Sequence, residues 1–500
     1  MTSSPTVTDR VPKTLPLPRE RWFSTLFFTE LAERFGFFGL QAVLVIFVAQ
    51  PVARGGLGLP PATAAALAGT WISVTYLLGG PGGWLADRVL GVRRTLLLGG
   101  VVTAIGHFTM AVPTTVTSGI GLLLVSAGAG LYRPNHQAMC NLLFGSESTR
   151  RESGISMLYV GVQLSALLAP LLVGFIGDRY GWHLGFLCGG VMMLFGLIVL
   201  RRGTKFFGGV GEDIARPLRG RETRRAVRIG VIGGVLAIAL AGLGSAGLLP
   251  VFAVISLLGL VTLVAPIVAY ILLYRDRGLT GVDKTKLRSF LWVVVGWTLF
   301  FMMISQGGSV MLLFAQNSTD RNLFGFSVPA SWFESVSPFC ILILAPVFAW
   351  LLPRMGGGTG ALPRKFTIAL LLSGGSFVVM AGGALLASGG RLVSPLWLVL
   401  AYFMLSCAEL IVLAAGTAAA SDVVPKAYIS QTIGVLGLFA AFGGGVGSQI
   451  VLIAQVLPAD GYYLAFGLVV CVVGVVMLVR RRAISRGLAG TPQLSIEDNT

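Results

Sequence analysis

The chain alternates long apolar runs with short polar segments, and the runs are long enough to cross a lipid bilayer as helices. The hydrocarbon core of a bilayer is about 30 Å thick, which needs about 20 apolar residues in a helix. A window of this length predicts fourteen membrane-spanning helices. They cover residues 24–49, 63–82, 93–112, 116–138, 153–177, 182–201, 228–247, 250–273, 289–315, 331–352, 365–388, 394–420, 429–456 and 461–480.

Composition supports the same fold class. Hydrophobic residues make up 55% of the chain and charged residues 11%, whereas a soluble domain has roughly 25% charged residues. We therefore expect an all-α polytopic protein that spans the lipid bilayer of the cell membrane. The first apolar run follows a polar arm and is too long for a cleavable signal peptide, so we expect it to remain as a helix.

The basic residues lie mainly in alternate loops between the apolar runs. The net charge is +17, which could also indicate a nucleic-acid partner, but loops rich in Lys and Arg face the cytoplasm in membrane proteins. The charge therefore predicts that both termini and the 201–228 loop are cytoplasmic, and that no nucleic acid is bound. The opposite loops hold only Arg54, Arg179, Arg321 and Arg391.

Three ionisable residues interrupt the first apolar run. Glu30, Glu33 and Arg34 are spaced so that all three can face the interior of a helix bundle. A charge at this depth costs at least about 2.5 kcal/mol on insertion scales, so such residues pair with one another or line a transport path. These three residues form either a proton switch or a fixed ion network that holds helices together.

Two other spans carry single charges. Arg133 precedes Pro134, which bends or interrupts helices, and its guanidinium can hold a substrate carboxylate bidentately or brace Glu30 or Glu33. Glu409 is the acidic residue within the apolar run at 394–420 and can receive an ammonium group. Together, Arg133 and Glu409 suit a zwitterionic substrate.

The turn at residues 82–94, which reads GGWLADRVLGVRR, resembles the loop signature of the major facilitator superfamily. The resemblance implies two six-helix bundles that rock around a site at the middle of the membrane. Two of the fourteen helices are then extra, and we expect 228–247 and 250–273 to form a lipid-facing insertion without a part in binding. The expected organisation is a cytoplasmic arm at 1–22, a bundle at 23–202, a basic loop and insertion at 203–288, a second bundle at 289–482 and a disordered tail at 483–500.

Several segments resemble motifs of the proton-dependent oligopeptide transporter family, in the family's order. Residues 30–39 read ELAERFGFFG and are similar to its ExxERFxYYG motif; residues 130–135 read GLYRPN and are similar to its GxxKPN motif; residues 159–163 read YVGVQ and are similar to its YxGIN motif. Segments 320–323 and 329–333 and Glu409 also resemble family positions. The resemblance implies proton coupling through Glu30, Glu33 and Arg34.

The chain also departs from the family pattern at positions that the resemblance places in the pocket. Gln41 stands where the family has an Arg, Gln163 where it has an Asn, Ser305 where it usually has an acidic residue and Ser337 where it has an Asn. Tyr76 matches a pocket Tyr of the family, although a lone Tyr in a membrane helix can equally be a packing residue. The resemblance thus implies a substrate site of Gln41, Tyr76, Arg133, Gln163, Ser305, Ser337 and Glu409, with less charge than usual.

These observations predict a proton-coupled secondary transporter of di- or tripeptides or peptide-like compounds. We expect a monomer that is driven by the proton gradient without a cofactor. Because the sequence contains no nucleophile triad, phosphate-binding loop or zinc motif, we do not expect an enzyme, and we interpret His107, His136 and His183 as interfacial or structural. The alternatives are a transporter or exporter of a non-peptide amphipathic compound, and a non-transporting receptor on a carrier scaffold.

Overall fold

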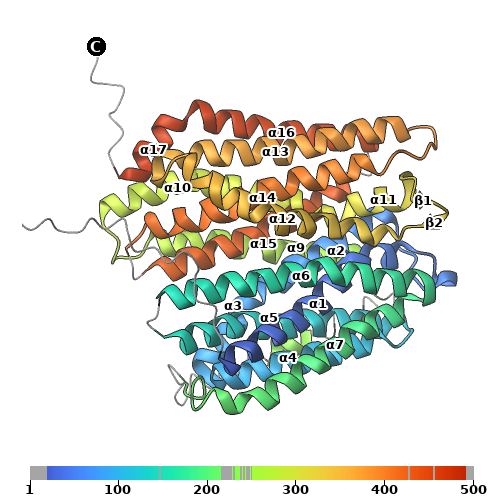
Figure 1. Cartoon of the computed structure of the whole chain (residues 1–500), viewed down its shortest axis with the longest axis horizontal. Coiled ribbons are helices and arrows are strands. Elements are labelled where there is room, and N and C mark those ends of the chain that lie inside the picture. Colours follow the sequence, from blue (N-terminus) through green and yellow to red (C-terminus); the bar gives the residue numbers. More distant parts are fainter. Residues whose placement is uncertain are drawn as a thin grey trace, which may run out of the picture.

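The structure, a computed structural model, consists of long helices that run side by side and one short β-hairpin (Figure 1). It describes residues 20–490 except 146–147, 215–223, 225–227, 229–230, 237–238, 240–241, 244–247, 249, 426–427 and 454–456. The hairpin pairs β1 (Asn322–Leu323) with β2 (Phe326–Ser327). We call the end of the molecule that carries this hairpin the hairpin end. The opposite end, where α1 begins and α17 lies, is the terminal end.

The first bundle is formed by the helices before residue 207. Its second helix is broken, because Gly79, Gly80 and Pro81 interrupt the apolar run after Leu77. A π-helical turn then leads to Gly91, whose positive φ of 80° allows the chain to enter the next helix. The elements are α1 (Arg21–Ala49), η2 (Val52–Arg54), α2 (Pro61–Leu77), α3 (Gly79–Leu85), η3 (Ala86–Leu90), α4 (Val92–Met110), α5 (Thr115–Phe144), α6 (Ser148–Tyr180), α7 (Trp182–Gly203) and η4 (Thr204–Phe206).

The second bundle follows α9 (Val251–Tyr274). Its first helix begins at a capping box, in which Thr280 and Asp283 each accept a backbone N–H of the other residue. That helix changes to a π-helical turn at Gly307 before it continues as α11. The elements are α10 (Gly281–Ile304), η5 (Gly307–Met311), α11 (Leu312–Ser318), η6 (Ala330–Ser335), α12 (Val336–Arg354), α13 (Gly358–Ala387), α14 (Leu396–Asp422), α15 (Ile429–Ile453), α16 (Ala459–Val479) and α17 (Arg481–Ala489).

Twelve helical segments of the described residues are long and apolar enough to span a membrane. Of the two further predicted spans, α4 is a helix that packs between α5 and α7, but Arg93, Arg94 and His107 lower its mean hydropathy. Half of the residues of the span predicted at 228–247 lie outside the described residues. An all-α membrane fold with about twelve spans is thus established, and fourteen spans remain a prediction.

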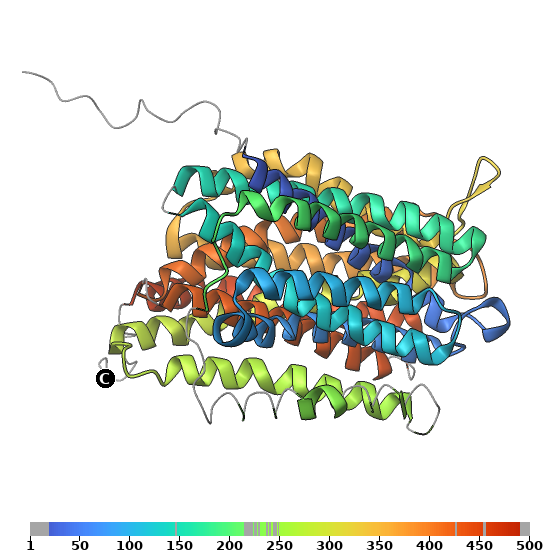
Figure 2. The same ribbon diagram turned by 90° about the horizontal axis from the view of Figure 1, so that it is seen from below.

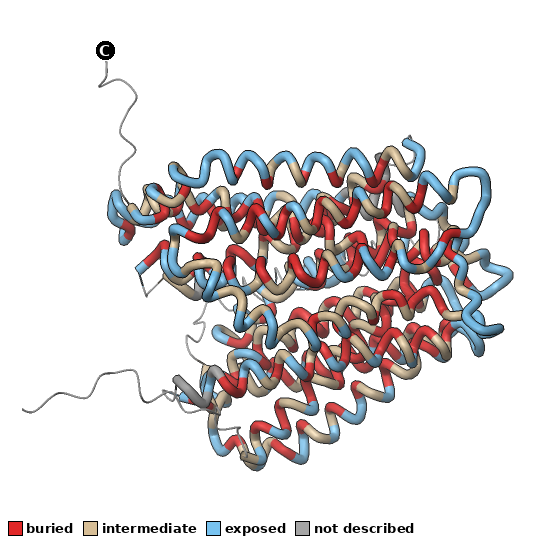
Figure 3. Tube along the Cα trace, turned by 45° about the horizontal axis from the view of Figure 1, so that its top comes forward, coloured by how far each residue is buried: buried red, intermediate tan, exposed pale blue. Residues whose placement is uncertain are grey.

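Exposure follows the pattern expected for a protein in lipid. Turns that face the interior of each bundle are buried, whereas the outermost turns are exposed (Figure 3). On α16, the exposed positions are apolar and include Leu468, Val472 and Val475. A continuous exposed apolar surface of this kind suits a hydrocarbon environment.

The α9 helix lies on the outside of the assembly, across the line where α2 of the first bundle meets α15 of the second (Figure 2). Its inner side approaches α15 closely: a Cβ on Gly259 would collide with Gln449, and one on Gly445 would collide with Thr262. Its outer side exposes Leu260, Val264 and Ile267, among other apolar residues. The helix thus has one packed face and one face suited to lipid.

The two bundles meet at the hairpin end through what we call the α6–η6 contact. Trp332 donates its indole N–H to the Leu171 carbonyl oxygen at 3.0 Å, and Ser335 donates to the Leu167 carbonyl oxygen at 2.7 Å. A Cβ on Gly174 would overlap Ser331. Two hydrogen bonds and this close approach therefore hold the bundles together at the hairpin end.

Candidate substrate site

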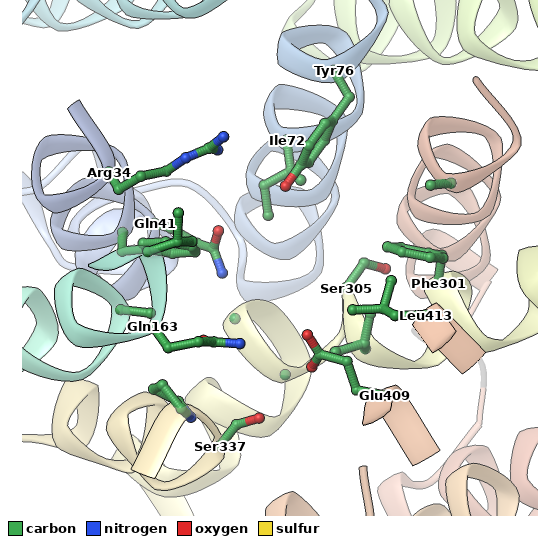
Figure 4. Close-up of a pocket in the computed structure, with 18 of the residues that line it drawn as sticks. Arg34, Gln41, Ile72, Tyr76, Gln163, Phe301, Ser305, Ser337, Glu409 and Leu413 are labelled. Carbon is green, nitrogen blue, oxygen red and sulfur yellow. The ribbon is translucent and has the colours of Figure 1, made fainter. Parts of the chain in front are cut away.

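A cavity of about 550 Å³ lies between the two bundles. Its walls come from α1, α2, α5 and α6 on one side and from α10, η5, η6, α12, α14 and α15 on the other (Figure 4). On α6 the lining runs from Pro170, near the α6–η6 contact, to Ile155, near the start of that helix. The cavity therefore extends toward the terminal end, and the volume is typical of small-molecule sites.

The cavity brings together most of the residues that the sequence analysis selected. Glu30 and Arg34 line it beside six residues of the expected substrate site. Glu33 and Arg133 are not among the lining residues and lie behind the wall. The six residues are Gln41, Tyr76, Gln163, Ser305, Ser337 and Glu409.

A network of charged residues occupies the wall of the first bundle. Arg34 Nε is 2.8 Å from Glu30 Oε1 and 3.6 Å from Glu33 Oε2, while Arg133 Nε is 3.0 Å from Glu33 Oε1. On the other side of Glu30, His136 Nδ1 lies 3.1 Å from Oε2. Two buried carboxylates therefore share three basic groups, and a proton that moves among them would change which pairs form.

Arg133 acts as a brace in this conformation. Besides its contact with Glu33, its guanidinium carbon lies 3.9 Å from the centre of the Phe37 ring, a cation–π geometry. Its Nη1 and Nη2 atoms are buried and make no hydrogen bond within the described structure. Pro134 lies inside α5, which continues to Phe144. Direct binding of a substrate by Arg133 would need a different conformation.

His136, which we interpreted as interfacial or structural, contacts the charge network and lines the cavity. Its Nε2 is 2.9 Å from the Leu26 carbonyl oxygen, so its ring bridges α1 backbone and the Glu30 carboxylate. The spacing contained a signal, because His136 follows Arg133 by three residues on the same face of a helix. His183 instead contacts the Met110 carbonyl oxygen at 2.8 Å, as a structural residue would.

The opposite wall carries two acidic residues, Glu409 of α14 and Glu334 of η6. The Glu409 carboxylate points into the cavity toward the amide of Gln163, which comes from the other bundle (Figure 4). Gln163 also donates to the Tyr159 hydroxyl at 2.7 Å. Glu334 did not enter the sequence-based site. Like Glu30, it is an acidic residue inside a predicted apolar run, here the run at 331–352, so the same signal was available for it.

The two serines of the expected site are hydrogen-bonded within the second bundle. Ser305 donates to the Met302 carbonyl oxygen at 3.0 Å, and Ser337 lies 2.9 Å from the Ser406 hydroxyl. Next to Ser305, the π-helical turn η5 exposes the Gly307 carbonyl oxygen, which accepts a bond of 2.9 Å from Tyr402. Such turns often occur at functional sites. Across the described residues, no cluster of three or more His, Cys, Asp or Glu residues could hold a metal ion.

Comparisons with known proteins agree on one family. The POT family model matches residues 93–464. The uncharacterized transporter YclF of Bacillus subtilis (strain 168) is 33% identical over 473 residues, which cover 94% of this chain and 95% of that protein. The peptide transporter YePEPT of Yersinia enterocolitica is 32% identical over 479 residues, with coverage of 91% and 93%. A crystal structure of peptide transporter POT in complex with sulfate superposes with a TM-score of 0.87 at 33% identity, over 94% of this chain and 96% of that one.

Proposed function

This chain belongs to the POT family, a family of membrane transporters rather than enzymes, and from that premise we propose that it carries di- or tripeptides or similar zwitterions together with protons. The proposed mechanism is alternating access, in which the two bundles rock around the central cavity. The proton gradient would supply the energy.

The observation that carries the proposal is the separation of charge across the cavity. Arg34 lines the wall of the first bundle, and Glu409 lines the wall of the second. A peptide zwitterion carries a carboxylate at one end and an ammonium group at the other, so it can contact both walls at once. We assign the carboxylate to Arg34 in this conformation, with Gln41 and Tyr76 as polar neighbours, because Arg34 lines the cavity and Arg133 does not.

Between these charges the cavity has apolar walls that suit peptide side chains. Phe38 and Ile72 contribute from the first bundle, and Trp297, Phe301 and Leu413 from the second. Apolar surfaces contribute affinity without selecting a particular side chain, whereas a few placed polar groups fix the orientation of the ligand. We therefore expect broad tolerance of side chains and a strict need for free termini.

Blocked substrates test the proposed roles of the termini. Losing one partner of a desolvated, hydrogen-bonded charge pair costs about 2–5 kcal/mol, or at least about thirtyfold in affinity. Glu409→Gln should therefore weaken the binding of dialanine at least about thirtyfold and that of N-acetyl-dialanine far less. Asp422→Asn, on the same helix but outside the cavity lining, is the matched control and should bind both peptides like the wild type. Binding to the purified protein is measured by calorimetry.

A second candidate function is transport of a non-peptide amphipathic compound, in either direction. It is favoured by Gln41 and Ser305, which carry no charge at two positions that face the cavity. A site with fewer charged partners rejects analogues less sharply. Failure of the wild type to bind dialanine, or equal losses for free and blocked peptides in Glu409→Gln, would favour this candidate.

Proton coupling is proposed to involve Glu30, Glu33 and Arg34, and we propose a monomer with both termini in the cytoplasm. With that orientation the terminal end is cytoplasmic, so the cavity would face the cytoplasm and the α6–η6 contact would close the outer side. The coupling is tested in proteoliposomes by comparing proton-driven uptake of substrate with substrate exchange in the absence of a gradient. Glu33→Gln should abolish the proton-driven uptake and leave the substrate exchange measurable.

A further inference from the structure

Glu334 lies at a junction of the two bundles. It sits on η6 between Trp332 and Ser335, the two residues that donate hydrogen bonds across the α6–η6 contact. Its carboxyl group interacts with Gln41 of α1, in the opposite bundle. It also lines the central cavity. Glu334 therefore belongs to the helical turn that forms the closed contact, and its carboxyl group lies beside the substrate cavity.

The Glu334 carboxyl group has no positive partner in the described structure. Its Oε1 atom is buried and makes no hydrogen bond. The basic groups of the cavity region are all engaged elsewhere: Arg34 and His136 contact Glu30, and Arg133 contacts Glu33. A buried carboxylate without a partner is costly, and the cost is avoided when the group binds a proton.

The surrounding elements leave room for this carboxyl group but supply no compensating charge. A Cβ on Gly308 of η5 would lie 2.5 Å from Glu334 Oε1, so the absence of a side chain there makes the space. The elements packed against η6 are α1, α6, α11, α12 and α14. Their titratable or charged groups toward the cavity are Glu30 and Arg34 of α1, Tyr159 of α6, and Tyr402 and Glu409 of α14.

We propose that Glu334 is a proton-binding residue that couples protonation to closure of the α6–η6 contact. In this role Glu334 replaces the acidic residue that the family usually has at the position of Ser305, between α10 and η5. A neutral carboxyl group can remain in the closed contact beside Gln41. A charged carboxylate favours opening, because opening admits water to it. A proton taken up at the hairpin end would thus close that end and leave Glu334 facing the cavity, where the proton can depart.

A substrate-free measurement tests this mechanism directly. Spin labels at Val52 and Leu323, which are exposed on opposite bundles at the hairpin end, report the opening as a distance in liposomes. In the wild type the distance should lengthen as the pH rises. Glu334→Gln, which mimics the protonated acid, should keep the short distance at every pH. The same pH-dependent lengthening in Glu334→Gln and in the wild type would overturn the proposal.

A transport measurement adds the second test, and this part rests on the proposed function. In proteoliposomes, Glu334→Gln should lower proton-driven accumulation of dialanine at least tenfold and leave dialanine exchange within twofold of the wild type. Glu334→Asp should keep part of the accumulation, and Asp213→Asn, in an exposed loop, should keep all of it. Equal loss of exchange and accumulation in Glu334→Gln would overturn the proposal. Absence of dialanine exchange in the wild type would instead refute the peptide function, while the distance measurement would still decide the role of Glu334.

Discussion

Three basic residues share two carboxylates in the wall of the first bundle, and each pair has a different geometry. Arg34 contacts both Glu30 and Glu33, whereas Arg133 and His136 each contact one of them. The Arg34 contacts lie within α1, whereas the Arg133 and His136 contacts join α5 to α1. Changes of protonation in this network can therefore alter the packing of two helices and not only a local charge.

Arg133 provides a test at this scale. Removing one partner of a buried ion pair costs about 3–5 kcal/mol, and less where the pair retains some exposure and a second partner. We expect Arg133→Gln to lower the thermal midpoint of the detergent-purified protein. The double variant Arg133→Gln with Glu33→Gln should recover most of the loss, because no uncompensated carboxylate remains.

A wild-type midpoint in Arg133→Gln would contradict the bracing role and return Arg133 to substrate binding. The matched control is Arg88→Gln, at the terminal end of the first bundle, where no ion pair with a described acidic residue is present. That variant should retain the midpoint of the wild type.

The sequence selected many of the residues that line the cavity, because charges inside apolar runs are rare and conspicuous. It could not predict which partner each charge contacts, since Arg133 could reach a substrate, Glu30 or Glu33 from its position on the helix. Glu334 and His136 carried usable signals that were not followed. The bridging role of His136 depends on the approach of α5 to α1, and a linear pattern does not contain that distance.

At the scale of helices, small residues determine where α2, α9 and α15 touch. A Cβ on Gly444 would lie 2.7 Å from the Ser73 hydroxyl, and one on Gly445 would lie even closer to the Thr262 hydroxyl of α9. Association of helices in lipid depends on close van der Waals packing of this kind, because apolar side chains gain little by leaving lipid. The three helices are therefore joined by backbone proximity more than by interlocking side chains.

A substitution on α15 tests this packing. Gly445→Leu should destabilise the protein by about 1–3 kcal/mol, because the new side chain overpacks the contact with Thr262. Gly434→Leu is the matched control on the same helix, since a Cβ there meets no atom within 4 Å. Thermal unfolding followed by intrinsic fluorescence measures both variants. Equal midpoints for the two would show that α9 does not depend on this contact.

Helix boundaries were predicted well where apolar runs end at glycine, proline or charged residues, and less well where a run is broken internally. The predicted span at 63–82 ends inside α3, whereas the helical path continues through a π-helical turn to Leu90. The π-helical turn at η5, whose sequence is GGSVM, was also not foreseen. Hydropathy measures solvent preference and carries no information about hydrogen-bond register.

For the whole molecule, the structure represents one conformation of a transporter, with the α6–η6 contact closed and the cavity on the terminal side. Gly174 is the tightest point of that contact, because any Cβ there would overlap Ser331. The stability of the closed conformation relative to an open one should therefore depend on the absence of a side chain at Gly174.

Gly174→Val is expected to shift the molecule toward opening at the hairpin end. Overpacking costs about 1–3 kcal/mol in the closed conformation alone, which changes the ratio of closed to open molecules about 5- to 150-fold. Spin labels at Val52 and Leu323 should report a longer distance than in the unsubstituted chain. Gly181→Val would introduce strain from its positive φ and is unsuitable as a control, so Gly233→Val, in open space, serves instead.

The glycines and serines along α2 and α15 also affect how fast the bundles can exchange conformations. Interdigitated side chains would have to change rotamers, one after another, whenever the helices turned against each other, and each change would add to the activation barrier. Smooth surfaces can rotate with few such changes. The line where α2 meets α15 can therefore serve as an axis about which the bundles rotate with a low activation barrier. The α9 helix contacts both α2 and α15 from the outside and can hold them together during this rotation.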